Sequence, residues 1–193
     1  MKKEKVSKDP QEMTDEELVI KIRKGDGAFF EELVKRYEQK LLRYVNYLTS
    51  GNDIANDVVQ DTFIKVYINL NSFKTDLKFS SWIYRIAHNE TMNRLRKYNF
   101  RMFQLDADFV DRFVQAPENV ETQLEREETS KNVTGALDSL PLKYKVPLVL
   151  YYMEDKSYDE IGDILRVSTG TVGTLINRGK KRLKDVLVSE GKI

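Results

Sequence analysis

Cysteine is absent from the 193-residue sequence, and His88 is its only histidine. Disulfide bonds and thiolate metal sites are therefore excluded, and one imidazole does not build a zinc site alone. No apolar run approaches the roughly 20 residues that a membrane-spanning helix needs. The basic N-terminus leads into acidic residues and not into the apolar segment of a secretory signal. We expect a cytoplasmic protein with no membrane insertion, metal or cofactor.

The sequence also lacks the residue sets that catalysis requires. It shows no nucleophile beside a general base, no cluster of metal ligands and no glycine-rich loop that would cradle a phosphate. His88 fits a DNA-facing or helix-surface position better than a catalytic one. We therefore predict that the chain is not an enzyme and carries no catalytic residue.

Proline (four residues), glycine (nine) and β-branched alternation are scarce, and apolar residues recur at the three- and four-residue spacing of helices. This spacing predicts helices over residues 28–48, 53–70, 80–97 and 168–188. Capping boxes at Thr14–Glu17 and Ser157–Glu160 predict two further helix starts. Pro141 suits a first helical turn, and Pro147 should bend its helix. The predicted fold class is all-α.

Charge divides the chain into two small helical domains joined by an acidic linker. Between Gln104 and Glu128, acidic residues far outnumber basic ones, and Pro117 interrupts any helical pattern until a helix resumes near Glu118. The predicted segments are a disordered basic extension at residues 1–11, a first domain at 12–100, the linker at 101–128 and a second domain at 129–193.

The clearest motif lies in the second domain, where a capped helix, a short turn and a second capped helix follow one another. Ile161 and Ile164 share the inner face of the first helix, Val167 is expected to fill the turn, and Val172 and Ile176 line the second helix. Such a helix-turn-helix places its second helix in the major groove of DNA. The outward face of that helix carries hydroxyl, amide and basic groups that suit base edges and phosphates: Thr169, Thr171, Thr174, Asn177, Arg178 and Lys181. The alternative is an ordinary helical hairpin with a solvated basic end.

Basic and aromatic residues interleave in the first domain between Asn71 and Arg101, where Asp76 and Glu90 are the only acids. Such a surface suits unpaired bases, because stacking on an aromatic ring is worth roughly 1–3 kcal/mol per base and tolerates any sequence. Aromatic residues at helical spacing also occur in cores. A ring that anchors a loop to the core remains the alternative for Trp82.

An acidic cluster occupies the first half of the predicted helix at residues 53–70. Asp53, Asp57, Gln60 and Asp61 complement the positive end of the helix dipole, or they form a docking face for a basic partner. The sequence alone slightly favours the dipole interpretation.

Several stretches together resemble the extracytoplasmic-function (ECF) class of bacterial RNA polymerase sigma factors. They are Asp57–Phe63 (DVVQDTF), Phe79–Asn89 (FSSWIYRIAHN), Leu140-Pro141, and Ser157–Ile161 (SYDEI) with Gly170–Val172 (GTV). The resemblance covers nearly the whole chain after Asp15. It implies a factor that binds core RNA polymerase and directs it to promoters, in a stress or envelope response.

The resemblance implies a role for each domain. The first domain would dock on core polymerase, open the minus-10 promoter element and capture its bases, while the second would read the minus-35 duplex through the outward helix face. The implied polymerase-binding residues are Asp57, Gln60, Asp61 and Phe63, which favours docking over the dipole interpretation. The implied minus-10 residues are Phe73, Lys78, Trp82, Arg85, His88, Asn89 and Asn93.

Two departures from the family pattern affect these expectations. Gly173 and Leu175 stand where the family often carries Lys or Arg, so a guanine contact worth about 1–3 kcal/mol is missing. Asn93 stands where an Asp is common, which affects local capping or base preference.

Regulation by an anti-sigma factor is a further implication of the resemblance. Two small domains on a flexible tether can close on each other, or on an inhibitor that covers both DNA faces. The alternative function is an autonomous helix-turn-helix regulator that binds DNA without polymerase.

Overall fold

Helices account for the regular structure of this chain. The computed structural model describes residues 9–51, 54–105 and 133–192, and no β-strand occurs within them. The first domain contains η1 (Pro10–Glu12), α1 (Asp15–Arg23), α2 (Phe29–Thr49), α3 (Ala55–Asn69), η2 (Leu70–Ser72) and α4 (Phe79–Leu105). The second contains a helical segment at residues 133–138, then α6 (Leu142–Tyr152), α7 (Tyr158–Leu165) and α8 (Thr169–Ser189). The all-α prediction is confirmed.

Both predicted capping boxes are present. Thr14 Oγ1 accepts the Glu17 amide at 3.2 Å, and the Glu17 carboxylate accepts the Thr14 amide at 2.9 Å. Ser157 and Glu160 exchange the same pair of bonds at 3.2 and 3.0 Å. Each box satisfies backbone donors that a helix start leaves free, which fixes where α1 and α7 begin.

The core of the first domain is organised around α2. Leu33, Tyr37, Leu41, Tyr44 and Leu48 follow one another at helical spacing and are at most 5% exposed. They pack against α1, α3 and α4, and full burial of each such side chain is worth about 1.5–3 kcal/mol. This packing makes α2 the scaffold on which the loop before α4 is held.

The second domain has the predicted helix-turn-helix, with one correction in the turn. Ile161, Ile164, Val172 and Ile176 are fully buried or nearly so, as expected. Val167, expected to fill the turn, is 36% exposed. The backbone occupies that space instead, since a Cβ on Gly162 would lie 2.9 Å from the Val167 carbonyl oxygen.

Two helix limits also differ from expectation. The helix predicted to end near residue 97 continues as α4 to Leu105, so the first residues of the predicted linker are helical. Pro141 is the N-cap of α6 and not part of its first turn, while Pro147 lies inside that helix as predicted. The rest of the predicted linker, residues 106–128, lies outside the described residues, together with the helix expected near Glu118 and most of the basic extension.

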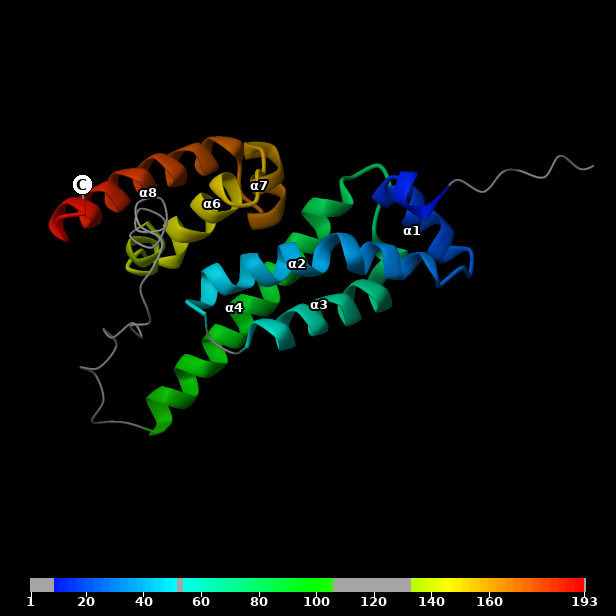
Figure 1. The fold of residues 1–193 in the computed structure, drawn as a ribbon, viewed down its shortest axis with the longest axis horizontal. Helices are drawn as coiled ribbons and strands as arrows, with labels where there is room; N and C mark the ends of the chain where they lie inside the picture. The colour runs from blue at the N-terminus through cyan, green and yellow to red at the C-terminus, as the bar shows by residue number, and fades with distance from the viewer. Residues whose placement is uncertain (1–8, 52–53, 106–132, 193) are drawn as a thin grey trace, which may run out of the picture.

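The two domains pack against each other in this structure (Figure 1). Helix α7 lies against α4, and α6 lies against α2. The short helix-turn-helix therefore meets the first domain near the beginning of α4. This arrangement determines which predicted DNA-binding side chains face solvent.

Candidate nucleic-acid interfaces

An aromatic cluster supports the loop between η2 and α4. The Phe73 ring lies 5.6 Å from Phe79 and 5.2 Å from Trp82, and Phe79 also contacts Tyr37 edge-on. Phe73 is 3% exposed, Phe79 is fully buried and Trp82 is half-buried. Such ring pairs add about 0.5–1.5 kcal/mol each beyond their burial. The cluster therefore holds this loop firmly on the core.

Polar contacts from α1 fix the two ends of the same loop. The Arg23 guanidinium donates to the Leu70 carbonyl at 2.6 and 3.1 Å, and it also donates to the Phe73 carbonyl. Glu16 accepts the Phe79 amide at 2.8 Å, which places a carboxylate at the N-terminus of α4. Sequence reasoning missed Arg23 and Glu16, because no local pattern links α1 to a loop so distant along the chain.

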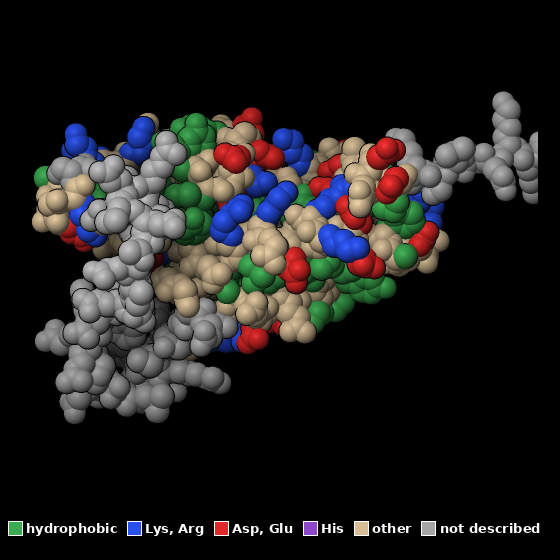
Figure 2. All heavy atoms as spheres, in the orientation of Figure 1, with side chains coloured by type: hydrophobic (Ala, Val, Ile, Leu, Met, Phe, Trp, Pro, Cys, Tyr) green, Lys and Arg blue, Asp and Glu red, His purple; other side chains and the backbone are tan. Residues whose placement is uncertain are grey.

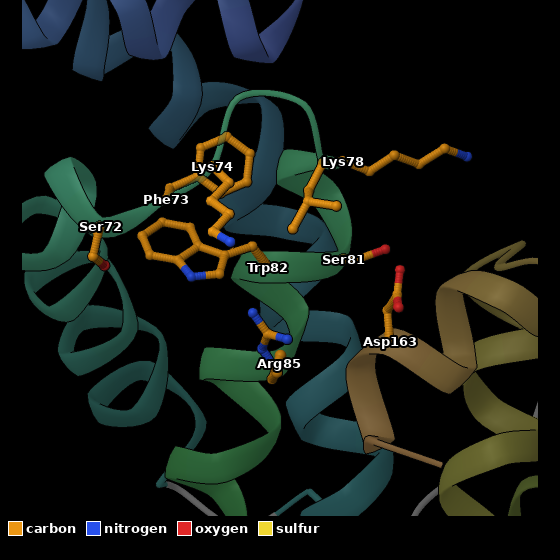
Figure 3. A pocket seen from close by; sticks show the side chains of 9 residues that line it. Ser72, Phe73, Lys74, Lys78, Ser81, Trp82, Arg85 and Asp163 are labelled. Atoms are coloured by element: carbon orange, nitrogen blue, oxygen red, sulfur yellow. The ribbon is translucent and has the colours of Figure 1, made fainter. Parts of the chain in front are cut away.

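A pocket of about 250 Å³ opens between this loop and the first turns of α4 (Figure 3). Phe73 and Trp82 form an aromatic wall, and Lys74, Lys78 and Arg85 supply positive charge around the opening. Ser81 also lines this pocket. Its hydroxyl is buried, points toward α7 in Figure 3 and has no hydrogen-bond partner among the described residues. Aromatic rings with cations around them are the chemistry that suits a nucleobase and its phosphate.

The remaining predicted minus-10 residues lie further along α4. Asn89 and Asn93 are exposed, and Asn93 accepts a hydrogen bond from Arg96 at 2.9 Å. The imidazole of His88 instead points to the core, with its Nδ1 3.1 Å from the hydroxyl of fully buried Tyr44. Burial lowers the pKa of His88 to about 4. His88 is therefore neutral at pH 7 and offers no cation to DNA in this structure.

The predicted polymerase-binding residues lie on the outer face of α3. Asp61 binds Arg94 at 2.6 Å, and Asp57 is 3.9 Å from the same guanidinium. Gln60 and Phe63 line a groove of about 420 Å³ between α2 and α3. The groove ends in apolar side chains that the predicted site did not include: Ile64, Tyr67 and Ile68, exposed by 49%, 57% and 70%.

The exposed apolar strip of Ile64, Tyr67 and Ile68 on α3 is not covered by any other described part of the chain. Figure 2 shows hydrophobic side chains gathered along the edge of the molecule where α3 runs. Exposed apolar groups in a row, bordered by the acidic side chains of Asp57 and Asp61, are typical of protein-binding surfaces. The acidic and apolar parts suit a partner with a basic rim and an apolar centre.

The six predicted minus-35 residues all lie exposed on α8. Ser168 caps the helix by accepting the Thr171 amide at 3.2 Å, as the sequence predicted. Thr174 donates its hydroxyl to the Gly170 carbonyl at 2.9 Å, and the Thr171 hydroxyl pairs with Ser168. Asn177, Arg178 and Lys181 carry the longer polar side chains of this face. The face matches a recognition helix whose reach comes from its second and third turns.

Neither a metal site nor a membrane span occurs in the described part of the chain. Among those residues, no three His, Cys, Asp or Glu side chains lie close enough together to hold a metal ion. None of the helices there is both long and apolar enough to cross a membrane.

The two surfaces define a class of protein that combines a basic, aromatic-walled pocket in one helical domain with a helix-turn-helix in another. Family comparison agrees domain by domain. Residues 33–101 match sigma-70 region 2, and residues 130–183 match sigma-70 region 4.

Full-length relatives narrow the family further. The chain is 33% identical over 187 residues to the ECF RNA polymerase sigma factor SigW of Bacillus subtilis, covering 91% of this chain and 98% of that protein. It is 33% identical over 185 residues to the ECF RNA polymerase sigma-E factor of Haemophilus influenzae, covering 91% and 96%. The chain belongs to the ECF RNA polymerase sigma factors, as the sequence motifs indicated.

Solved structures agree on the fold. CnrH in complex with the cytosolic domain of CnrY superposes with a TM-score of 0.67 at 21% identity, covering 91% of this chain and 97% of that one. RpoE in complex with the anti-sigma factor NepR from Bartonella quintana gives 0.66 at 23%, covering 82% and 96%.

Proposed function

We propose that this chain binds core RNA polymerase in the bacterial cytoplasm and directs it to specific promoters, in a stress or envelope response. The basic, aromatic-walled pocket of the first domain is the observation that carries this proposal. An autonomous duplex-binding regulator needs no such pocket, whereas a factor that opens promoters must hold bases taken out of the stack.

The pocket and α4 form the minus-10 surface, defined by Phe73, Lys78, Trp82, Arg85 and Ser81. Taking a base out of the duplex costs a few kcal/mol of stacking and pairing free energy. The cost is smallest at weak A·T steps. Stacking on the aromatic wall offsets that cost. Lys78 and Arg85 neutralise the phosphates that flank the captured base.

Core polymerase docks on α3 in this proposal. Asp57 and Asp61 provide an acidic rim, while Phe63 and the exposed strip of Ile64, Tyr67 and Ile68 supply apolar contact area. Such a centre-and-rim arrangement is that of stable interfaces. The role of Ile68 and its neighbours extends the docking site beyond the residues that the motif indicated.

The recognition helix α8 reads the minus-35 duplex. Asn177, Arg178 and Lys181 reach base edges and phosphates, since the hydroxyls of Thr171 and Thr174 are already engaged within the helix. Gly173 and Leu175 add no donor. Phosphate contacts therefore position this domain more than they specify sequence.

We also propose an anti-sigma factor as a regulatory partner. Two proteins of the same fold, CnrH and the Bartonella RpoE, have been solved in complexes with CnrY and with the anti-sigma factor NepR. A partner that covers the minus-10 surface and α3 would block both DNA and polymerase.

Run-off transcription with purified core polymerase tests the proposed function. Core plus this chain should start transcripts at defined positions on genomic fragments, and core alone should not. Transcripts should be lost when Ile68 is replaced by Asp, while an α2 surface variant, Gln39→Asp, should retain them. Failure of any template to yield specific starts would sink the proposal, and tight salt-sensitive binding to a palindromic duplex without polymerase would favour the autonomous regulator.

A further inference from the structure

One buried carboxylate joins the two domains. Glu154, just after α6, has a side chain that is 1% exposed. It accepts hydrogen bonds from Arg43 on α2 at 3.0 and 3.2 Å, and from the Tyr84 hydroxyl on α4 at 2.6 Å. A buried carboxylate is costly unless it is paired, and these three charge-assisted bonds come entirely from the other domain. Glu154 is therefore matched to the packed arrangement and not to its own domain.

The acidic residues of α7 continue the same contact onto the minus-10 surface. Glu160 pairs with Lys78 at 3.2 Å and accepts the Ser80 hydroxyl at 3.4 Å. Burial acts to raise the pKa of Glu160, but the hydrogen bonds from Ser157 and Lys78 outweigh it and the pKa is lowered. The carboxylate of Glu160 thus stands where a phosphate would pair with Lys78.

Asp163, one turn further along α7, lines the mouth of the basic, aromatic-walled pocket. In Figure 3 its carboxylate projects from α7 toward Ser81. Asp163 and Arg85 also line a second cleft, of about 430 Å³, that reaches Ser168 and Thr169 at the start of the recognition helix. Asp163 therefore borders both the pocket beside the loop and the cleft at the start of α8.

A smaller polar contact closes the far end of this interface. The Ser50 hydroxyl donates to Asp138 at 2.9 Å, and buried Lys145 binds Asp138 at 2.6 Å. Near the middle, the Lys156 ammonium sits 4.5 Å from the centre of the Tyr84 ring, and burial lowers the pKa of Lys156. Matched polar contacts thus lie at the ends and in the middle of an interface whose buried apolar residues form one cluster across both domains. Contacts between domains of one chain commonly allow relative motion.

We propose that the acidic face of α7, formed by Glu160 and Asp163, is a binding surface for the minus-10 surface of its own first domain. Glu154 latches the two together, so the free factor rests in a closed state. The identity of the covered surface rests on the proposed function. Lys78 does not bind Glu160 and a DNA phosphate at once, and Asp163 stands beside Arg85 at the pocket. The closed state therefore reduces the apparent affinity for minus-10 DNA in proportion to the fraction of molecules that are open.

Three variants distinguish the effect of the Glu154 latch, the effect of the acidic face of α7 and the effect of net charge alone. Glu154→Gln removes the latch charge. The double variant E160Q/D163N removes the α7 charges, while the glutamine introduced by E160Q still closes the capping box. The control D185N/E190Q makes the same charge change on exposed acids of α8 and its C-cap, away from the interface. Because the native chain has no cysteine, dyes placed on cysteines at positions 39 and 188 report the domain separation by single-molecule energy transfer.

The wild type should give one compact, high-transfer population. Glu154→Gln should shift at least half the molecules to a broad, low-transfer population and raise the affinity for a fluorescent single-stranded DNA library of mixed sequence about tenfold. E160Q/D163N should raise the affinity for single-stranded DNA about threefold to tenfold, and the control D185N/E190Q should raise it less than about twofold. Circular dichroism confirms that each variant is folded, and Tyr84→Phe, which loses a single hydroxyl, provides a milder opening variant.

A low-transfer wild type, or equal DNA affinities for E160Q/D163N and its control, would overturn the closed state. Those readouts need no polymerase, so they are separate from the proposed function. Run-off transcription of the same variants with core polymerase reports on that function alone. If the variants open as predicted but no transcripts start, the closed state is supported and the proposed function is contradicted.

Discussion

The two DNA-reading surfaces of this molecule are built on opposite plans. On α8, all six predicted contact residues are exposed, and the long side chains of Asn177, Arg178 and Lys181 extend into solvent. On the minus-10 surface, Phe73 is buried, Trp82 is half-buried, and α7 faces the pocket. A helix that binds duplex DNA needs exposed side chains on a rigid backbone. A surface that binds unpaired bases needs aromatic rings, and here those rings are also packed into the core. If the two surfaces act as proposed, minus-10 recognition requires a rearrangement and minus-35 recognition does not.

The largest effect should come from Phe73→Ala. Loss of a buried ring that contacts both Phe79 and Trp82 should lower the free energy of unfolding by about 3–5 kcal/mol. Urea denaturation followed by fluorescence of Trp82, the only tryptophan, measures this directly. Phe73→Leu should cost much less, about 1 kcal/mol. A cost below about 1 kcal/mol for the alanine variant would mean that the ring is not part of the core, which would remove the contrast with α8.

The second effect is a pH dependence that arises from His88 in the first domain. The pKa of His88 is about 4, below its ordinary value of 6.5, because burial disfavours the charged form. The unfolded chain therefore binds more protons between these values. Stability is complete above about pH 6.5 and falls by up to roughly 3 kcal/mol as pH drops through the folded pKa.

His88→Asn, which keeps an acceptor for the Tyr44 hydroxyl, should flatten this dependence between about pH 7 and pH 5. Urea midpoints at several pH values measure it through Trp82. If the wild type and the variant lose stability in parallel as the pH falls, groups other than the buried neutral imidazole cause the pH dependence.

The third effect should be large for function and nearly absent for stability. Arg178→Ala should weaken binding of the polymerase complex to minus-35 DNA by about 1–3 kcal/mol, because this side chain is exposed on α8. The thermal unfolding midpoint should not change. Lys35→Ala, an exposed cation on α2, is the control and should leave promoter affinity within about twofold. A fall in stability for the arginine variant would show that α8 is not the self-sufficient face that the comparison requires.

Sequence reasoning predicted what depends on neighbours along the chain. Capping boxes at Thr14 and Ser157 and the helical spacing of apolar residues set the helices, and the outward face of α8 followed from the same periodicity. The motif residues on α3 and α4 came from family resemblance. These features are local, so a single sequence contains them.

The features that sequence reasoning missed are contacts between distant residues. Glu154 and Arg43 are 111 positions apart, and nothing near either residue indicates the pair. Arg166 adopts a left-handed conformation with φ of 57°, although no glycine or asparagine marks that turn. An apolar residue in a short turn usually packs inward, so the sequence predicted a buried Val167. The left-handed residue before it was not predictable, and Val167 is 36% exposed in the structure.

The smallest effect concerns the departure at Gly173, inside the first turns of α8. A Cβ there would approach the Tyr158 ring at 3.4 Å, which is ordinary contact, so the position tolerates a side chain. Gly173→Ala should stabilise the helix by about 0.5–1 kcal/mol because it restricts the unfolded chain. Hydrogen exchange of α7 and α8 measures the gain locally. Gly162→Ala is the opposite case, since its Cβ would meet backbone at 2.9 Å, and it should destabilise the same segment. Equal exchange in both variants would show that the turn is loosely packed, and α8 would then lose the rigidity that distinguishes it from the minus-10 surface.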